Sequence, residues 1–178
     1  MADSMLTKKA LADALKAQLI EEPLDKISIG EICERCSLNR KSFYYHFDSK
    51  PDLVNWIFDT EFGADIQVNP DRLCWQDLEE LCCYLYDHKV FYKKILKSQD
   101  APFFTNHLKE FIEPILGNKL REVSERNMIT DFQVVFFTDA FIFTISRWLT
   151  DSKLISCEEF FRDLISCIYI PVQKCMVQ

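Results

Sequence analysis

The chain has 178 residues, of which 48% are hydrophobic, and it carries a formal net charge of −7. Its three glycines, Gly30, Gly63 and Gly117, lie far apart, so no glycine-rich loop can cradle a phosphate, which excludes Walker-type and dinucleotide-binding proteins. Abundant apolar residues with so little glycine predict an all-α protein of one or two compact domains.

The acidic excess lies outside the N-terminal region. Residues 1–50 hold eight Lys or Arg and eight Asp or Glu, whereas residues 51–178 hold 13 basic and 20 acidic residues. A neutral region can approach DNA locally while an acidic remainder stays away from the phosphates. Residues 1–22 are charged and polar-patterned, with no apolar signal segment, so we expect a cytoplasmic protein.

The first predicted helix has an apolar stripe at four-residue spacing, formed by Leu11, Leu15 and Leu19. Thr7 is a candidate N-cap for this helix, and Pro23 should follow its end. The stripe should support the elements that follow from behind.

Two short helices come next, joined by a tight turn. Ser28 stands three residues before Glu31, the spacing of a capping box, so the first of them should begin at residue 28 or 29. Asn39 is a candidate N-cap for the second, in which Phe43 and Phe47 share one face at i, i+4 spacing and pack inward. This pattern predicts a helix-turn-helix, whose second helix enters the major groove of DNA.

The outer face of the second helix carries cations, hydroxyls and aromatic donors, which can meet phosphates and base edges. The expected DNA-binding residues are Ser28, Asn39, Arg40, Lys41, Ser42, Tyr44, Tyr45, His46 and Lys50. Two alternatives stay open: a solvated face on a small helical hairpin, and a helical interaction module that never touches DNA.

From the second helix into the start of the next runs Phe43-Tyr44-Tyr45-His46-Phe47-Asp48-Ser49-Lys50, followed by Asp52 and Leu53. This run resembles the recognition-helix signature of the TetR (AcrR-type) transcriptional regulators. The resemblance implies a three-helix DNA-binding head, a helical body, a homodimer and an effector that controls operator binding. In that family, the positions of Tyr44 and Lys50 grip the DNA backbone. Ser37 stands where the family most often has glycine, so we expect left-handed backbone there at some cost.

A helix start at Ser49 and Pro51 opens a connecting segment, which ends at a joint around residues 63–69. We expect three parts: a helix-turn-helix DNA-binding domain over residues 1–50, a connecting helix and joint over residues 51–69, and a helical effector and dimerisation domain over residues 70–178.

Apolar periodicity predicts several helices in the body. They cover residues 75–86, 87–96, 103–124, a central run at 134–145, and a last helix capped by Ser156 with Glu159. Pro114 should kink or split the long third helix, and Pro171 should end or bend the last. The central run is apolar almost all round and shorter than the ~20 residues of a membrane span, which predicts a buried helix rather than an anchor.

The last two predicted helices carry more apolar surface than one bundle needs. On the last helix this surface comprises Phe160, Phe161, Leu164, Ile165 and Ile168. Two such helices can pair with their copies about a two-fold axis, which predicts a homodimer on a near-palindromic double-stranded operator. The alternative is that both faces are covered within the monomer.

Few polar groups are available to orient an effector in the body. They are Asp139, Thr144 and Arg147 on the central helix, with His107, and the alternative is a hydrogen-bonded core network. We expect an apolar or weakly polar small molecule. The segment 84–96 is similar to the subgroup of dihydroxyacetone-kinase operon activators, which implies a protein co-regulator as the alternative partner.

The eight cysteines mostly stand beside helix-periodic apolar positions, so we expect reduced core thiols. Cys33 and Cys36 form a single CxxC pair without a histidine at ligand spacing, and no metal is expected. His46, His88 and His107 are scattered, and no serine follows the pattern of a nucleophile elbow. The sequence therefore predicts neither an enzyme nor a cofactor.

Overall fold

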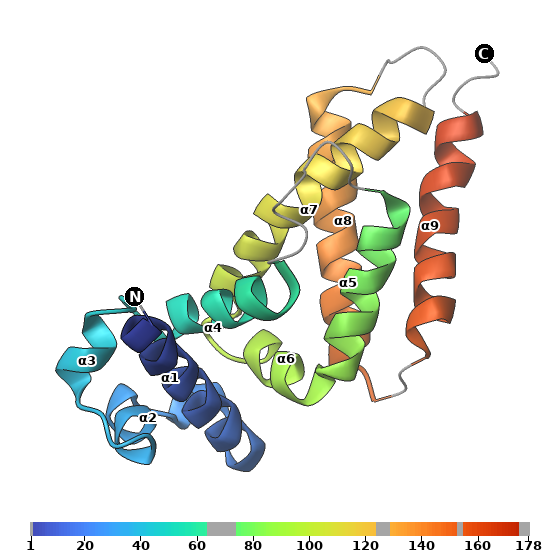
Figure 1. Ribbon diagram of the computed structural model, residues 1–178. Coiled ribbons are helices and arrows are strands. Elements are labelled where there is room, and N and C mark those ends of the chain that lie inside the picture. The colour runs from blue at the N-terminus through green and yellow to red at the C-terminus, as the bar shows by residue number, and fades with distance from the viewer. Residues whose placement is uncertain (1, 64–73, 124–128, 153–154, 175–178) are drawn as a thin grey trace. The chain divides into compact units, whose positions relative to one another are not determined.

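The computed structural model describes the backbone of residues 2–63, 74–123, 129–152 and 155–174. Every regular element in these ranges is a helix, so the predicted all-α class is confirmed (Figure 1). The chain divides into two compact units. Unit 1 contains residues 1–64 and 90–104, and unit 2 contains residues 65–89 and 105–178. Most of the predicted joint at residues 63–69 lies outside the described residues.

Unit 1 carries the helix-turn-helix. Its elements are α1 (Ala2–Glu21), the 3₁₀ turn η1 (Leu24–Lys26), α2 (Ile29–Arg35), α3 (Arg40–Tyr44), α4 (Lys50–Phe58), the π-helical turn η2 (Asp59–Gly63) and most of α6 (Lys89–Leu96). Helix α1 ends before Pro23, as predicted. Thr7 lies inside α1 and does not cap it, because the residues before it are also helical.

The apolar stripe of α1 forms the centre of unit 1. Leu11, Leu15 and Leu19 are each at most 1% exposed, and α1 contacts both α2 and α4. Burying one leucine side chain contributes about 2 kcal/mol. The predicted stripe is thus confirmed as the support on which the two short helices rest.

A segment from the middle of the chain also belongs to unit 1. The ammonium group of Lys94 donates to the carbonyl oxygens of Ile20 and Glu22, at 3.0 and 3.3 Å. The region expected as one body over residues 70–178 therefore contributes residues 90–104 to the unit that holds the helix-turn-helix.

Unit 2 is a helical bundle. It comprises α5 (Trp75–Asp87), α7 (Ala101–Val123) from Thr105 onward, α8 (Asp131–Thr150) and α9 (Cys157–Lys174), with α5 beside α9 (Figure 1). Helix α7 passes through Pro114 without interruption, so the predicted split is wrong. Ile112 and Ile115 on either side are fully buried, and their packing offsets the hydrogen bond that proline removes. Helix α9 likewise continues beyond Pro171.

One side of α8 is packed in the bundle and the other is not. Its exposed side carries Phe132, Phe136 and Phe143, which are 78%, 59% and 69% exposed. The prediction of a helix buried all round is therefore wrong, because an apolar run does not show which side lacks a neighbour. The length argument against a membrane span fails too: by length and composition alone the 20-residue α8 could cross a membrane, as many core helices could.

A disulfide joins Cys83 of α5 to Cys157, the first residue of α9, with the two Cα atoms 5.1 Å apart. The prediction of reduced thiols is wrong at this pair, because periodicity does not reveal which helices lie side by side. The free cysteines among the described residues are Cys33, Cys36, Cys74, Cys82 and Cys167.

Candidate nucleic-acid interface

Helix α2 begins with the predicted capping box. The Ser28 hydroxyl oxygen accepts from the amide of Glu31 at 3.2 Å, and the Glu31 carboxylate accepts from the amide of Ser28 at 2.7 Å. The hydroxyl and the amide of Ser28 together lower the pKa of Glu31. The Ser28 side chain is therefore engaged as the cap of α2 in the structure, and its contact with a phosphate stays a prediction.

The turn between α2 and α3 has the backbone conformation that the sequence predicts. Ser37 adopts a positive φ of 56°, and the amide of Leu38 donates to the carbonyl oxygen of Cys33 at 2.8 Å. This is a helix C-terminus of the kind that glycine usually closes. The turn is short and fixes the angle at which α3 leaves α2.

Asn39 caps α3, as predicted. Its side-chain oxygen accepts from the amide of Ser42 at 2.9 Å and lies 3.2 Å from the Ser42 hydroxyl, which donates to it. The cap thus satisfies one of the free amides at the start of α3, a helix of only five residues. In the structure Asn39 and Ser42 position the helix, and a contact of either with DNA stays a prediction.

Two phenylalanines hold α3 against unit 1. Phe43 is fully buried and Phe47 is 3% exposed, and their ring centroids are 5.8 Å apart. Phe47 also meets Trp56 of α4 edge-on at 5.8 Å. The inward face of α3 is therefore occupied by its anchors, and its polar side chains lie on the other side.

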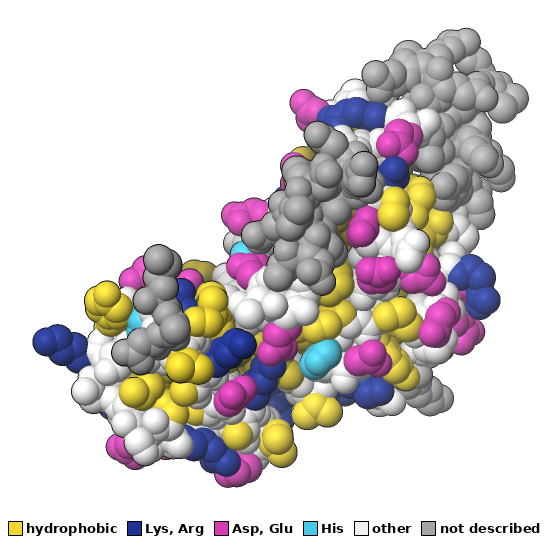
Figure 2. Space-filling view, in the orientation of Figure 1, with side chains coloured by type: hydrophobic (Ala, Val, Ile, Leu, Met, Phe, Trp, Pro, Cys, Tyr) yellow, Lys and Arg dark blue, Asp and Glu magenta, His cyan; other side chains and the backbone are white. Residues whose placement is uncertain are grey.

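The outward side chains of α3 and of the residues just after it are cationic or aromatic. Arg40 and Lys41 are exposed, and Tyr44 and Tyr45 are 57% and 82% exposed. His46 is half-buried, with its ring centroid 4.9 Å from that of Tyr45. Figure 2 shows a basic side chain projecting from unit 1 where α3 lies. Such a face offers charge for phosphates and hydrogen-bonding groups for base edges.

The absence of a side chain at Gly30 leaves room for the guanidinium group of Arg40. A Cβ atom at Gly30 would lie 2.8 Å from Nη2 of Arg40, so the guanidinium group passes over the first turn of α2 where there is no side chain. This role of Gly30 was not predicted from the sequence. A glycine at the second position of a helix, where its backbone freedom is not needed, was the available signal.

Lys50 has partners within the protein. Its ammonium group donates to the carbonyl oxygens of Leu24 and Ile27, at 2.8 Å each, and so fastens the turn η1 to the start of α4. An ammonium group has three N–H donors, so a further one can meet a phosphate. The predicted phosphate contact stays a prediction beside this structural role.

The four candidate effector residues of the body are spread over unit 2. Asp139 is exposed and accepts from Lys109 at 2.6 Å, Arg147 is exposed, and His107 is half-buried on α7. Thr144 donates to the carbonyl oxygen of the residue four before it, at 2.7 Å. The expectation of a buried position on the central helix is therefore wrong for Asp139 and Arg147, whereas Thr144 is half-buried.

Open hollows lie among the described residues of unit 2. A groove of about 640 Å³ between α7 and α8 is lined mainly by charged residues: Asn106, Lys109, Glu110, Glu113, Pro114, Arg121, Asp131 and Val134. A second hollow, of about 500 Å³, lies between α8 and α9 and is largely apolar, with Phe136, Phe160 and Leu164 in its wall. Thr144 lines this second hollow.

A capped helix-turn-helix with cations and tyrosines exposed on its second helix defines a DNA-binding transcriptional regulator. Residues 11–57 match the family of bacterial regulatory proteins named tetR, and residues 75–169 match the transcriptional regulator C-terminal region TetR_C_8. The chain belongs to the TetR family, and the resemblance found in the sequence is confirmed.

Several relatives fit this assignment. The HTH-type dhaKLM operon transcriptional activator DhaS of Lactococcus lactis is 33% identical over 96 residues, which are 53% of this chain and 51% of the relative. This chain thus matches about half the length of that curated relative. The match relates the chain to the DhaS subgroup, whose named member is a regulator rather than an enzyme.

Two solved structures have the same fold. The dihydroxyacetone kinase operon activator DhaS aligns over 95% of this chain and 97% of its own, with a TM-score of 0.67 and 21% identity. A TetR transcriptional regulator from Streptococcus agalactiae aligns over 94% and 96%, with a TM-score of 0.71 and 20% identity. At these identities the likeness concerns the fold alone.

Proposed function

We propose that this protein is a cytoplasmic transcriptional regulator that binds a near-palindromic operator as a homodimer, through the outward face of α3 in each copy. The supporting observation is the two-sided character of α3. Its anchors Phe43 and Phe47 are buried, while Arg40, Lys41 and Tyr45 are exposed. The free face of α3 carries cations and hydroxyl groups and no carboxylate, which suits contact with phosphates.

The residues of this face would have different roles. Tyr44 and Lys50 would contact phosphates, which contributes affinity for every sequence. Arg40 or Tyr45 would meet base edges, where one good contact discriminates by about 1–3 kcal/mol. Lys41, Ser42 and His46, with the caps Ser28 and Asn39, would complete the phosphate contacts.

The direct test is to select DNA fragments from the source genome with the purified protein and to measure binding by mobility shift. Arg40→Ala should relax the sequence preference at one position of each half-site. Arg35→Ala is a matched control, because it removes an arginine of the same unit that is paired with Glu21. If Arg40→Ala and Tyr45→Ala both bind every sequence as the wild type does, the outward face of α3 does not contact base edges.

The exposed side of α8 supports the homodimer. Phe132, Phe136 and Phe143 are large apolar side chains on the exposed side of one helix, and Phe136 also lines the apolar hollow between α8 and α9, as is typical of a protein interface. A two-fold axis would bring the same apolar surface of a second copy onto this one.

Control of operator binding would come from the body. The groove between α7 and α8 is the candidate site for a small-molecule effector, and its charged and apolar lining would suit a ligand that carries both polar and apolar groups. An effector acts only if it binds the two states of the dimer with different affinity. A thermal-shift screen of polar and apolar metabolites tests this, since a ligand of the folded state raises the melting temperature.

A protein co-regulator is the alternative to a small molecule. The open shape of the groove supports it, because an open charged surface suits a protein partner as well as a small ligand. Because one relative is named as an operon activator, the test should ask whether this protein activates transcription. A protein recovered on the immobilised dimer, together with no stabilising metabolite, would favour this alternative.

A further inference from the structure

Cys82 and Cys83 are neighbours in α5 with different surroundings. Cys82 is fully buried, and this burial raises the pKa of its thiol far above the ordinary range, so it stays protonated and inert. Cys83 is half-buried and is bonded to Cys157. Cys157 is only 7% exposed, so Cys83 is the less buried residue of the pair.

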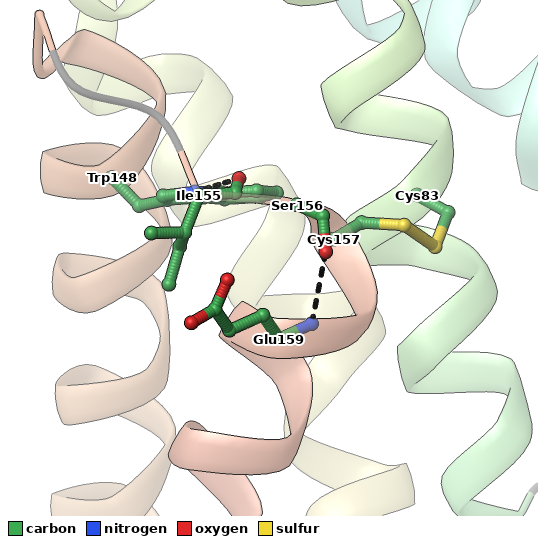
Figure 3. Close-up of a disulfide and its surroundings, with 6 residues drawn as sticks. All are labelled: Cys83, Trp148, Ile155, Ser156, Cys157 and Glu159. Carbon is green, nitrogen blue, oxygen red and sulfur yellow. Dashed lines mark hydrogen bonds between the residues drawn. A yellow bond between two sulfur atoms is a disulfide. The ribbon is translucent and has the colours of Figure 1, made fainter.

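Contacts other than the disulfide hold the two cysteines close together. Nε1 of Trp148 donates to the carbonyl oxygen of Ile155 at 3.2 Å, just before Cys157 (Figure 3). The Trp148 ring stacks on Phe160 of α9 at 4.0 Å and on Tyr86 of α5 at 5.5 Å. Helices α5, α8 and α9 thus meet at one tryptophan. None of these contacts uses a cysteine sulfur, so we expect the stack to hold the two thiols adjacent when the disulfide opens.

We propose that Cys83 and Cys157 are a reversible redox pair that hydroperoxides close and thiol reductants open. In the closing reaction the Cys83 thiolate attacks the peroxide, the O–O bond breaks, and a sulfenic acid forms with release of water or an alcohol. The Cys157 thiolate then attacks the Cys83 sulfur, the S–O bond breaks, and the oxygen leaves as water. The two thiols lose two electrons and two protons, and the peroxide receives both.

The disulfide attaches α5 to the start of α9, the helix that forms the apolar hollow together with α8. Cys157 begins α9, and Phe160, Leu164 and Ile168 further along the same helix line this hollow. In the oxidised chain the first turn of α9 is tied to α5, whereas in the reduced chain packing alone holds it. This step rests on the proposed homodimer: the oxidised chain dimerises more tightly, because its α8–α9 surface is fixed before association.

The first experiment tests the chemistry alone. The full chain is reduced, treated with hydrogen peroxide, and digested without reductant for mass spectrometry. A linked Cys83–Cys157 peptide that dithiothreitol removes is expected, and in Cys157→Ser a dimedone adduct on Cys83. Cys167→Ser, which removes an exposed cysteine outside the pair, should form the link as the wild type does. The absence of the linked peptide would overturn the redox pair, whatever the protein does with DNA.

The same sulfurs could instead hold a metal ion. The sulfur atoms of Cys83 and Cys157 and a carboxylate oxygen of Glu158 lie within 4.8 Å of one another. The reduced protein is therefore also incubated with zinc and dialysed before the peroxide is added. The proposed redox pair would be overturned by three results together. The wild type would retain zinc, Cys83→Ser would lose it, and the bound zinc would protect the thiols from peroxide. If the Cys83–Cys157 disulfide forms at the same rate with and without zinc, the result supports the redox pair.

The last experiment tests the consequence for the dimer. Sedimentation compares the oxidised and reduced wild type, and the oxidised form should have a dimer dissociation constant lower by about threefold or more. Cys83→Ser should show no difference between the two conditions. Equal constants in the wild type would overturn the link between the disulfide and the dimer. Monomers under both conditions would instead overturn the proposed homodimer, with the mapped disulfide unaffected.

Discussion

The ammonium group of Lys50 closes the turn that leads into the helix-turn-helix. We predict that Lys50→Ala lowers the free energy of unfolding by about 1–2 kcal/mol, because the carbonyl groups of Leu24 and Ile27 lose their donor. It should also weaken binding to all DNA sequences and reduce the salt dependence by about one phosphate contact. Denaturant titration and binding at several salt concentrations measure the two effects separately.

Lys41→Ala is the matched control, because Lys41 is an exposed lysine of the same surface. It should reduce the salt dependence without changing the stability. If Lys50→Ala changes the stability but leaves the salt dependence as it was, the role of Lys50 is structural only.

Glu31 makes the stability of α2 depend on pH. The hydroxyl and the amide of Ser28 hold the pKa of this carboxyl below its ordinary value of 4.5. A carboxyl whose pKa is lower in the folded than in the unfolded chain contributes stability above the unfolded pKa, and the contribution is lost as the pH falls through the folded value. We predict that below about pH 4.5 the wild type loses stability more steeply than Glu31→Gln, whose side chain does not titrate. Thermal melts over a pH series measure this, and parallel curves would contradict it.

Local rules made part of the site predictable. The caps Ser28 and Asn39 follow from residue type and spacing along a few positions, and both are confirmed. The place of the Arg40 guanidinium over Gly30 and the bonds from Lys50 to the turn before α2 join separate elements. No short-range pattern specifies such pairs, because they form only when the helices assemble.

The turn between α2 and α3 places a serine in a conformation that suits glycine. Ser37 has a φ of 56°, where a Cβ atom crowds the backbone. We predict that Ser37→Gly raises the free energy of unfolding by up to about 1 kcal/mol, after the larger chain entropy of glycine is subtracted. The denaturation midpoint measures this. Ser37→Ala keeps the Cβ atom and should give no gain, so an equal gain in both variants would assign the effect to the hydroxyl group.

Helix starts were easier to predict than helix ends. The hydroxyl groups of Ser49 and Ser156 accept from amides in the first turn of α4 and α9, as capping patterns indicate. Pro114 and Pro171 failed as stop signals, because a helix held by tertiary packing tolerates the loss of one amide donor. The exposed side of α8 was missed for a similar reason, since burial depends on neighbours that periodicity does not identify.

The sequence suggested Phe161 and Ile165 of the last helix as residues at which to test the dimer interface, but the structure favours other side chains. Phe161 is buried and Ile165 half-buried within unit 2, so a charge at either would disturb the bundle itself. We predict that Phe136→Glu, at a side chain that is 59% exposed, raises the dimer dissociation constant about tenfold or more and leaves the melting temperature of the monomer unchanged. Sedimentation over a concentration series measures this.

Phe103→Glu provides the comparison, because Phe103 is 60% exposed but belongs to unit 1. It should dimerise as the wild type does. A Phe136→Glu protein that remains a dimer at low concentration would rule out this side of α8 as the interface.

At the scale of the whole chain, composition and motif predicted the all-α class and the regulator family correctly. The chain order did not predict that residues 90–104 pack with the N-terminal unit, or that Cys83 and Cys157 are bonded. Both depend on contacts between segments far apart in the sequence, which a single sequence does not encode in any short pattern.

A symmetric dimer should leave a symmetric footprint on DNA. Two copies of α3 related by a two-fold axis must enter the same face of the duplex, so half-site centres should lie about 34–36 Å apart, or about 10 base pairs, or a multiple of this. Selection from random DNA should therefore return a near-palindrome.

Inserting about five base pairs between the half-sites turns them to opposite faces of the duplex, and the affinity should fall to that of a single half-site. Arg40→Ala should relax the same base in both halves, because each copy of the chain reads its own half. Footprinting and mobility shift on the selected site and on the insertion measure these effects. A selected sequence without symmetry, unaffected by the insertion, would contradict the dimer and still leave α3 as the helix that meets DNA.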